Sequence, residues 1–156
     1  MWLLPAAALC AATPAAAEYL MYSVTDLGTF GGSNSAGYGI NNSMQVVGWA
    51  AATDQTTRAF LWQNGVMQDL GLLPGGSNSG AWDINSQGEI AGWSHVTQGY
   101  YRAVCWSNGA IHDLGTLAGR ESAAYSISDN SIVSGWSTEL YTNGDDTMPQ
   151  AFIVRN

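Results

Sequence analysis

Few side chains in this sequence could carry out acid–base, nucleophilic or metal chemistry. The histidines are His95 and His112, the cysteines are Cys10 and Cys105, and lysine is absent. Neither histidine has cysteine or carboxylate neighbours at the spacing of a metal site. The sequence also lacks a Gly-x-Ser-x-Gly nucleophile motif, a phosphate-binding glycine loop and paired carboxylates at a repeated spacing. We therefore predict a protein that is not an enzyme, with no catalytic residue, no metal site and no cofactor.

Cys105 is the one thiol outside the apolar N-terminal segment that contains Cys10. If that segment is removed as a leader, Cys105 has no partner for an internal disulfide. We expect it to be a buried free thiol that packs as a small apolar side chain. An intermolecular disulfide is the alternative.

Aromatic side chains are the other candidates for binding, since they make up 11% of the chain. Three tryptophans recur after a glycine and are expected to pack between repeats: Trp49, Trp93 and Trp136. A second set occupies equivalent positions in three predicted strands, where Trp82 matches Tyr38 and Tyr125. This trio is the best candidate for stacking on a ligand such as a glycan, and Asn34 and Asn78 of the Gly-Gly-Ser-Asn-Ser loops are candidates for polar contacts with it.

Carboxylates recur at fixed positions in an Asp-Leu-Gly motif, at Asp26, Asp69 and Asp113. We expect each to accept backbone N–H groups at a turn. A longer acidic loop, residues 139–149, reads ELYTNGDDTMP. Because Ca²⁺ takes about 6–8 oxygen ligands, the few oxygen-bearing side chains of this loop predict a solvated loop rather than a cation site.

The element that must position these residues is an internal repeat. Residues 33–76 and 77–120 are near-copies at an offset of 44 residues, so that Ile40 matches Ile84 and Trp49 matches Trp93. Residues 121–156 form a third, partial copy. A period of this length indicates repeat architecture.

Each full copy predicts four short strands separated by turn residues. In the first copy these are residues 36–40, 45–50, 58–62 and 66–70, and Asn64-Gly65 predicts a two-residue hairpin turn. The third copy predicts strands at residues 123–127, 132–137 and 150–154 and ends without a fourth. Residues 19–28 alternate apolar and polar side chains and end in the same Asp-Leu-Gly motif, so we predict a twelfth strand there. Its apolar and turn residues are Tyr22, Val24, Asp26 and Leu27.

These strands predict an all-β fold of three four-stranded antiparallel repeats that resemble propeller blades, in which the N-terminal strand completes the last repeat. A single chain has too few such blades for a closed propeller, whereas two chains would have enough. A β-trefoil or a β-prism is the alternative, since both use three four-stranded repeats.

The motif set resembles the HAF family of bacterial extracellular repeats over residues 24–154. Its parts here are Asp-Leu-Gly, Gly-Gly-Ser-x-Ser, Ile-Asn, Val-Val-Gly-Trp, Ala-Phe-Leu-Trp and Asn-Gly-x-Met-x-Asp-Leu-Gly. The His-Ala-Phe of the family name is replaced by Arg58-Ala59-Phe60, Arg102-Ala103-Val104 and Gln150-Ala151-Phe152. The resemblance implies secretion and a four-stranded repeat, and it implies no enzymatic activity.

The composition and the N-terminal segment indicate which binding partners and which cellular location to expect. The net charge is −8 and the only cations are four arginines, which argues against binding nucleic acid or docking on anionic lipid. Residues 1–17 are apolar and end in Ala-Ala-Ala before Glu18, which indicates a signal peptide or else a retained apolar arm. The segment is too short and alanine-rich for membrane insertion. We expect an extracellular or cell-surface protein whose single repeat domain is residues 18–156.

Two functions follow as hypotheses. The first is a secreted structural protein that associates with copies of itself, its repeats completed by strand exchange within or between chains. The second is an extracellular carbohydrate-binding module that uses the aromatic trio and the Gly-Gly-Ser-Asn-Ser loops.

Overall fold

The structure, a computed structural model, describes residues 22–97, 99–139 and 149–155. Within these residues every regular element is a β-strand, so the coarse prediction of an all-β fold is confirmed. The described residues contain no helix long and apolar enough to cross a membrane.

The strands form three antiparallel sheets that follow the chain in order. The first sheet contains β1 (Gly31–Ile40), β2 (Val46–Ala52), β3 (Thr57–Gln63) and β4 (Val66–Asp69). The second sheet contains β5 (Ser79–Ile84), β6 (Ile90–His95), β7 (Tyr101–Ser107) and β8 (Ala110–Asp113). The third sheet contains β9 (Ser122–Ile127), β10 (Val133–Ser137) and β11 (Gln150–Val154). Within each sheet every strand pairs with the next one along the chain, and the strands predicted within the three copies are all present.

The tight turns form where the sequence predicts them. Asn64 and Gly65, between β3 and β4, have φ angles of +54° and +81°, and Asn108 and Gly109, between β7 and β8, have +52° and +76°. Positive φ at both central residues is the requirement of the type I′ hairpin turn, which matches the twist of the flanking strands.

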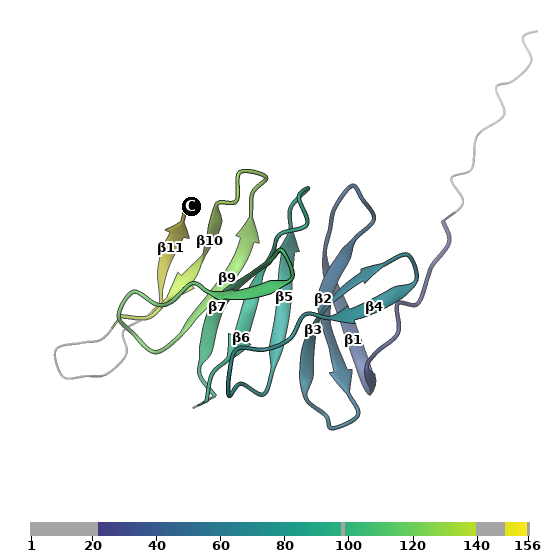
Figure 1. Ribbon diagram of the computed structural model, residues 1–156, viewed down its shortest axis with the longest axis horizontal. Helices are drawn as coiled ribbons and strands as arrows, with labels where there is room; N and C mark the ends of the chain where they lie inside the picture. The colour runs from purple at the N-terminus through teal and green to yellow at the C-terminus, as the bar shows by residue number, and fades with distance from the viewer. Residues whose placement is uncertain (1–21, 98, 140–148, 156) are drawn as a thin grey trace, which may run out of the picture.

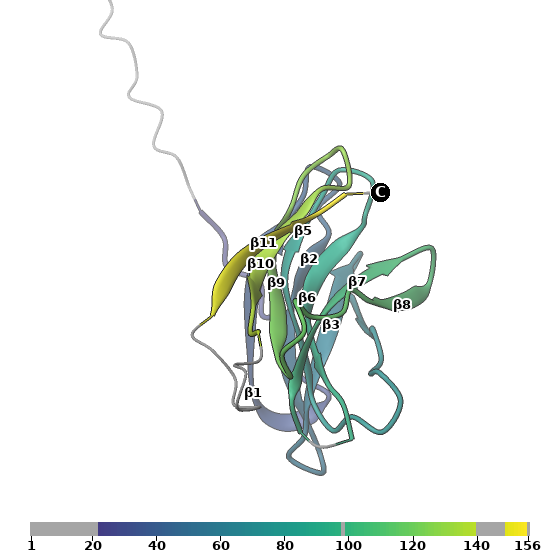
Figure 2. The ribbon, with the colours of Figure 1, turned by 90° about the vertical axis from the view of Figure 1, so that its left-hand side faces the viewer.

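The three sheets lie side by side in an open row (Figures 1 and 2), and none of them closes on itself. The described N-terminal residues lie beside the first sheet, at the opposite end of the row from β11 (Figure 1). The prediction of a strand at residues 19–28 is wrong for its described part, since residues 22–29 form no strand. The third sheet has three strands among the described residues, so the described part of the N-terminal segment does not complete it within its own chain. The reason is distance, because the first and second sheets separate the segment from the edge of β11.

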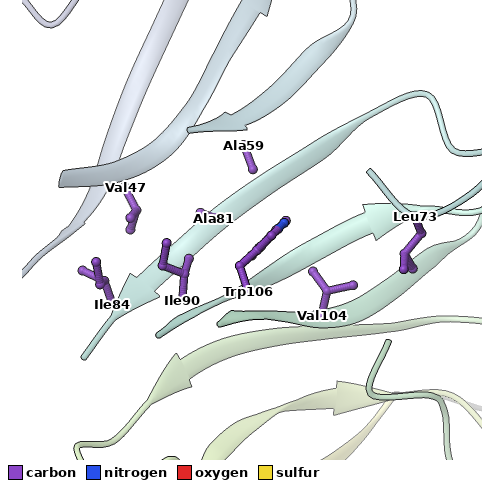
Figure 3. Packing of buried hydrophobic residues seen from close by; sticks show 8 residues of the cluster. All are labelled: Val47, Ala59, Leu73, Ala81, Ile84, Ile90, Val104 and Trp106. Carbon is purple, nitrogen blue, oxygen red and sulfur yellow. The ribbon is translucent and has the colours of Figure 1, made fainter. Parts of the chain in front are cut away.

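The core lies between neighbouring sheets. Between the first and second sheets a buried cluster is formed by small and medium apolar side chains (Figure 3): Val47, Ala59, Leu73, Ala81, Ile84, Ile90, Val104 and Trp106. Between the second and third sheets the buried cluster is Ala91, Ala103, Ala124, Ile127 and Val133. Burying these side chains away from water is the main force that holds the sheets together.

The glycine of each Gly-Trp pair is required because the backbone of the preceding strand lies very close to it. A Cβ at Gly92 would collide with the backbone carbonyl oxygen of Gly80 on β5. The β5–β6 register shifts beside it, between Ala81 and Asp83. Glycine marks such places because any side chain would force the two backbones apart.

Candidate functional site

The segments that lead from one sheet to the next share one local geometry. Asp69 accepts a hydrogen bond from the amide of Gly71 at 2.8 Å, and Asp113 accepts one from Gly115 at 2.8 Å. Both glycines have positive φ, +82° and +76°. The predicted role of these aspartates as acceptors of backbone N–H groups at a turn is therefore confirmed.

A buried serine then connects each sheet to the one before it. The Ser79 hydroxyl donates to the carbonyl of Gly71 at 3.0 Å and accepts from the amide of Ala59 at 2.9 Å. Ser79 is fully buried, as is Ala59. The hydroxyl thus satisfies two backbone groups that the sheet boundary would otherwise leave without partners.

The same arrangement recurs at the second boundary. Ser122 donates to the carbonyl of Gly115 at 2.6 Å and accepts from the amide of Ala103 at 2.9 Å. The alanine that donates also accepts through its carbonyl, from Leu70 at the first boundary and from Leu114 at the second. The two boundaries therefore have the same set of hydrogen bonds, of which those to the serine hydroxyl cross from one sheet to the next.

The N-terminal end of the row carries half of this arrangement. Asp26 accepts from the amide of Gly28 at 2.9 Å, Gly28 has a φ of +85°, and Ser35 donates to the Gly28 carbonyl at 2.7 Å. Within the described residues no amide donates to the Ser35 hydroxyl, and Ser35 is exposed, unlike Ser79. Among the described residues, this end of the row therefore has part of the hydrogen bonding of an internal boundary.

The predicted assembly strand lies at this end without strand pairing. Tyr22 and Val24 have exposed fractions of 86% and 97%, Asp26 is exposed, and Leu27 is partly buried. The residue of β4 that corresponds to Val24 is Met67, since Asp26 and Asp69 are 43 residues apart, and Met67 is partly buried. The apolar side chain at this repeat position is thus partly buried in β4, as Met67, and exposed at the N-terminal end of the row, as Val24.

At the C-terminal end of the row, residues of β11 are exposed although the corresponding residues of the other sheets are buried or packed against the core. Ala151 corresponds to the fully buried Ala59 and Ala103, and it is exposed on β11. Ile153 corresponds to Leu61, which packs against the core between the first two sheets, and its exposed fraction is 56%. The edge of β11 that corresponds to the β4-paired edge of β3 has no strand beside it among the described residues.

A second candidate site is formed by aromatic side chains on neighbouring sheets. The rings of Tyr38 on β1 and Trp82 on β5 lie edge to face with centroids 4.5 Å apart. The rings of Trp82 and of Tyr125 on β9 follow at 6.2 Å. The structure therefore brings together all three aromatic residues that the sequence singled out, and together they line a depression of about 440 Å³.

Three further aromatic residues join this row and were not predicted as binding residues. Trp93, Tyr101 and Trp136 line an adjoining depression of about 180 Å³ together with Trp82 and Tyr125. We call the six residues the aromatic groove: Tyr38, Trp82, Trp93, Tyr101, Tyr125 and Trp136. Trp93 pairs with Gly80 and Ala103 on the neighbouring strands, and these small residues cannot cover its ring. Small residues in the neighbouring predicted strands were therefore the feature of the sequence that could have indicated an uncovered tryptophan.

The two predicted asparagines do not line the aromatic groove. The side-chain Oδ1 of Asn78 accepts a hydrogen bond from the backbone amide of Thr57 at 2.7 Å, which joins the first two sheets. Asn34 is exposed and its side chain accepts from the hydroxyl of Ser33 at 3.2 Å.

A further group of reactive side chains lies between the second and third sheets. Cys105 on β7 lies opposite His112 on β8, and both line a depression between the second and third sheets with Glu89. Burial raises the pKa of the Cys105 thiol, and the negative charge of Glu89 raises it further. A protonated thiol is a poor nucleophile and a poor metal ligand. In the described part of the chain no three His, Cys, Asp or Glu side chains come close enough to hold a metal ion. Most of the predicted acidic loop, residues 140–148, lies outside the described residues.

Comparison of the chain with protein-family models, curated proteins and solved structures gave no match.

Proposed function

We propose that this chain is a secreted, non-enzymatic structural protein that assembles head to tail. The resemblance to HAF repeats supports secretion and the absence of enzymatic activity. In this assembly, residues 23–26 of one copy form the fourth strand of the third sheet of the next copy. The observation that supports the proposal is that the turn at Gly28 and Ser35 has two of the hydrogen bonds of an internal sheet boundary, although the described residues contain no sheet before it.

The internal boundaries specify the register of the joint. Leu70 donates to the Ala59 carbonyl, and Asp69 pairs with Phe60 across β3 and β4. By equivalence, Leu27 of one copy would donate to Ala151 of the next, and Asp26 would pair with Phe152. Backbone hydrogen bonds of this kind give a donated strand its affinity, whatever its side chains are.

The Ser35 hydroxyl would complete its hydrogen bonding at the joint. Ser79 and Ser122 each accept from the amide of an alanine in the preceding sheet. The corresponding donor for Ser35 is the amide of Ala151 in a second copy. The same contact would cover Val24 and Ile153, whose exposed fractions in the single chain are 97% and 56%. Burial of these apolar side chains favours association at about 25 cal/mol per Å².

A joint between two different ends is a heterologous interface, which produces a ring if the rotation closes and a filament if it does not. Two chains would contribute six sheets, since each has three. Closed propellers have about 4–8 blades, so a two-chain ring falls within that range.

The test uses one variant of the N-terminal donor segment, one variant of the C-terminal β11 edge, and a mixture of the two proteins. Val24→Asp with Leu27→Asp places charges in the donor segment. Ile153→Pro removes an amide from the open edge of β11 and leaves the pairing with β10 in place, because alternate residues of a strand point their backbone groups to opposite neighbours. Val66→Asp is the control, since Val66 is also exposed but lies on β4, which is neither the donor segment nor the open edge of β11.

We expect the full chain and the Val66→Asp variant to form dimers, rings or filaments by light scattering and negative-stain imaging. Each end variant alone is expected to be a folded monomer by circular dichroism and light scattering. An equimolar mixture of the two end variants retains one intact donor and one intact acceptor, so it should give a two-chain complex and nothing larger. A wild-type chain that stays monomeric at all concentrations, or end variants that still self-associate, would contradict the proposal.

A further inference from the structure

The aromatic groove runs across all three sheets. Its members come from β1, β5, β6, β7, β9 and β10. The two depressions share Trp82 and Tyr125, so they form one continuous surface. The exposed fractions of Tyr38 and Tyr125 are 50% and 55%, which is high for aromatic side chains placed at a boundary between sheets.

One tryptophan of the groove lies flat against its sheet. A Cβ at Gly80 would lie 2.8, 3.0 and 3.1 Å from the Nε1, Cε2 and Cζ2 atoms of Trp93, so the indole ring rests directly on the β5 backbone. On the neighbouring strand β7, Trp93 faces Ala103, and the ring of Tyr101 meets it edge to face at 4.9 Å. The outer face of the indole is therefore the one that lines the groove.

The third sheet repeats this arrangement at Trp136. Its cross-strand partners are Ala123 and Ala151, both of them small. Ala123 also lines the groove, between Trp136 and Tyr125. Small neighbours on both sides leave a wide indole uncovered, and a row of such indoles makes a platform for planar ligands.

The lining specifies the class of ligand. No side chain of the aromatic groove carries a charge, so nothing in the groove would hold a phosphate, a sulfate or a carboxylate. The larger depression, about 440 Å³, is in the size range of small-ligand sites, and the smaller one, about 180 Å³, adjoins it. The ligand should therefore be neutral, extended, and apolar on its faces with hydrogen-bonding groups at its edges. Linked pyranose rings have these properties, because their C–H groups point above and below the ring and their hydroxyl groups point outward.

We infer that the aromatic groove binds a neutral polysaccharide chain, whose sugar rings stack on Trp82, Trp93 and Tyr125. The phenol hydroxyl groups of Tyr38 and Tyr125 are positioned to bond the sugar edges; that of Tyr38 already accepts from the indole N–H of Trp49 at 3.2 Å, which orients it. None of the groove residues belongs to the donor segment or to β11, so different variants test the groove and the assembly proposed above.

The test is native affinity electrophoresis of the full chain in gels that contain cellulose derivatives, glucomannan, galactomannan or mixed-linkage β-glucan, with co-sedimentation on insoluble cellulose and chitin. Alginate, an anionic polysaccharide, is the comparison for charge. The variants are Trp82→Ala and Tyr125→Ala, with Trp62→Ala as the matched control, since Trp62 on β3 is partly buried but lies outside the groove.

We expect retardation by at least one neutral polysaccharide, about a tenfold loss of affinity in Trp82→Ala and in Tyr125→Ala, and wild-type affinity in Trp62→Ala. The inference is overturned if no neutral polysaccharide retards the chain, if only alginate does, or if the groove variants bind as well as the wild type. It is also overturned if Trp82→Ala changes the self-association of the chain and not its sugar binding, because the groove is then a surface for a second copy.

Discussion

The hydroxyl of Ser79 accepts a hydrogen bond from the amide of Ala59 across the boundary between the first two sheets, at 2.9 Å. The same hydroxyl donates to the carbonyl of Gly71 at 3.0 Å. Ser35 at the N-terminal end keeps only the second kind of bond. This difference between two equivalent serines is the observation behind the head-to-tail assembly that we propose.

Ser79→Ala should lower the free energy of unfolding by about 1–3 kcal/mol, because it leaves buried backbone groups of Ala59 and Gly71 without partners. Ser122→Ala should have an effect of the same size. Ser35→Ala, at an exposed position, should change the stability of the single chain by no more than about 0.5 kcal/mol and should weaken self-association. Urea denaturation and light scattering measure the two effects separately. Equal destabilisation by all three changes would be inconsistent with an incomplete boundary at Ser35.

Gln150→Arg should strengthen head-to-tail association. Arg58 and Arg102 lie 3.9 and 3.6 Å from Asp69 and Asp113 inside the first and second sheets, and Gln150 occupies the corresponding position in the third. An arginine there would face Asp26 of the next copy. Since exposed ion pairs are worth about 0.2–1 kcal/mol, we expect a gain in affinity of up to about fivefold. Sedimentation velocity over a concentration series measures it.

The control for that change is the double variant Gln150→Arg with Asp26→Asn. It should have no more than wild-type affinity, and the gain of the single variant should shrink in high salt because salt screens exposed charges. A gain that survives the loss of Asp26 would place the new arginine opposite another group and would contradict the proposed register.

Gly92→Ala should destabilise the protein by at least about 2 kcal/mol, since the new Cβ would collide with the backbone of Gly80. Gly109→Ala is the comparison, because nothing lies within 4 Å of the Cβ position there and only its positive φ opposes the change. Thermal unfolding followed by circular dichroism should therefore show the larger loss in Gly92→Ala. The reverse order would mean that β5 and β6 separate easily.

Stability should fall as the pH drops from about 7.5 to 5.5 because of His95. Burial lowers the pKa of its imidazole below the ordinary value of 6.5, and the nearby Glu121 carboxylate opposes the shift. A group whose pKa is lower in the folded state takes up its proton more readily in the unfolded state, so acidification below 6.5 favours unfolding. The loss should disappear in His95→Asn and remain in His112→Asn. A pH dependence that is unchanged in His95→Asn would assign it to other groups.

Cys105 should react slowly with a thiol reagent at pH 7.5. Burial and the charge of Glu89 keep its thiol protonated, and the thiolate is the reactive form. We expect the rate of disulfide exchange with a chromogenic disulfide to be much lower than that of the urea-unfolded chain. Glu89→Gln, which removes the charge, should raise the rate. Spontaneous formation of disulfide-linked dimers in air would contradict this prediction and support the intermolecular bridge.

The sequence by itself determined the strands within the three copies and the turns between them. These features depend on local chemistry: alternation of apolar and polar residues selects strands, and Asn64-Gly65 selects a type I′ turn through the positive φ that both residues adopt. The spacing of 44 residues also brought Tyr38 and Trp82 to equivalent positions, which was enough to single out the residues that meet at 4.5 Å.

Only the tertiary structure decided what happens at the two ends of the row and which tryptophans remain uncovered. Residues 22–28 carry a strand pattern, but a strand needs a partner edge, and the edge of β11 lies at the other end of the molecule. Trp93 recurs as a packing residue would, yet the small residues opposite it and the position of β5 leave one face of its ring in a groove. Strand pairing and side-chain burial depend on residues that are distant in the sequence. A local pattern can therefore predict a strand, but the neighbouring sheets determine whether that strand is paired and which of its side chains are exposed.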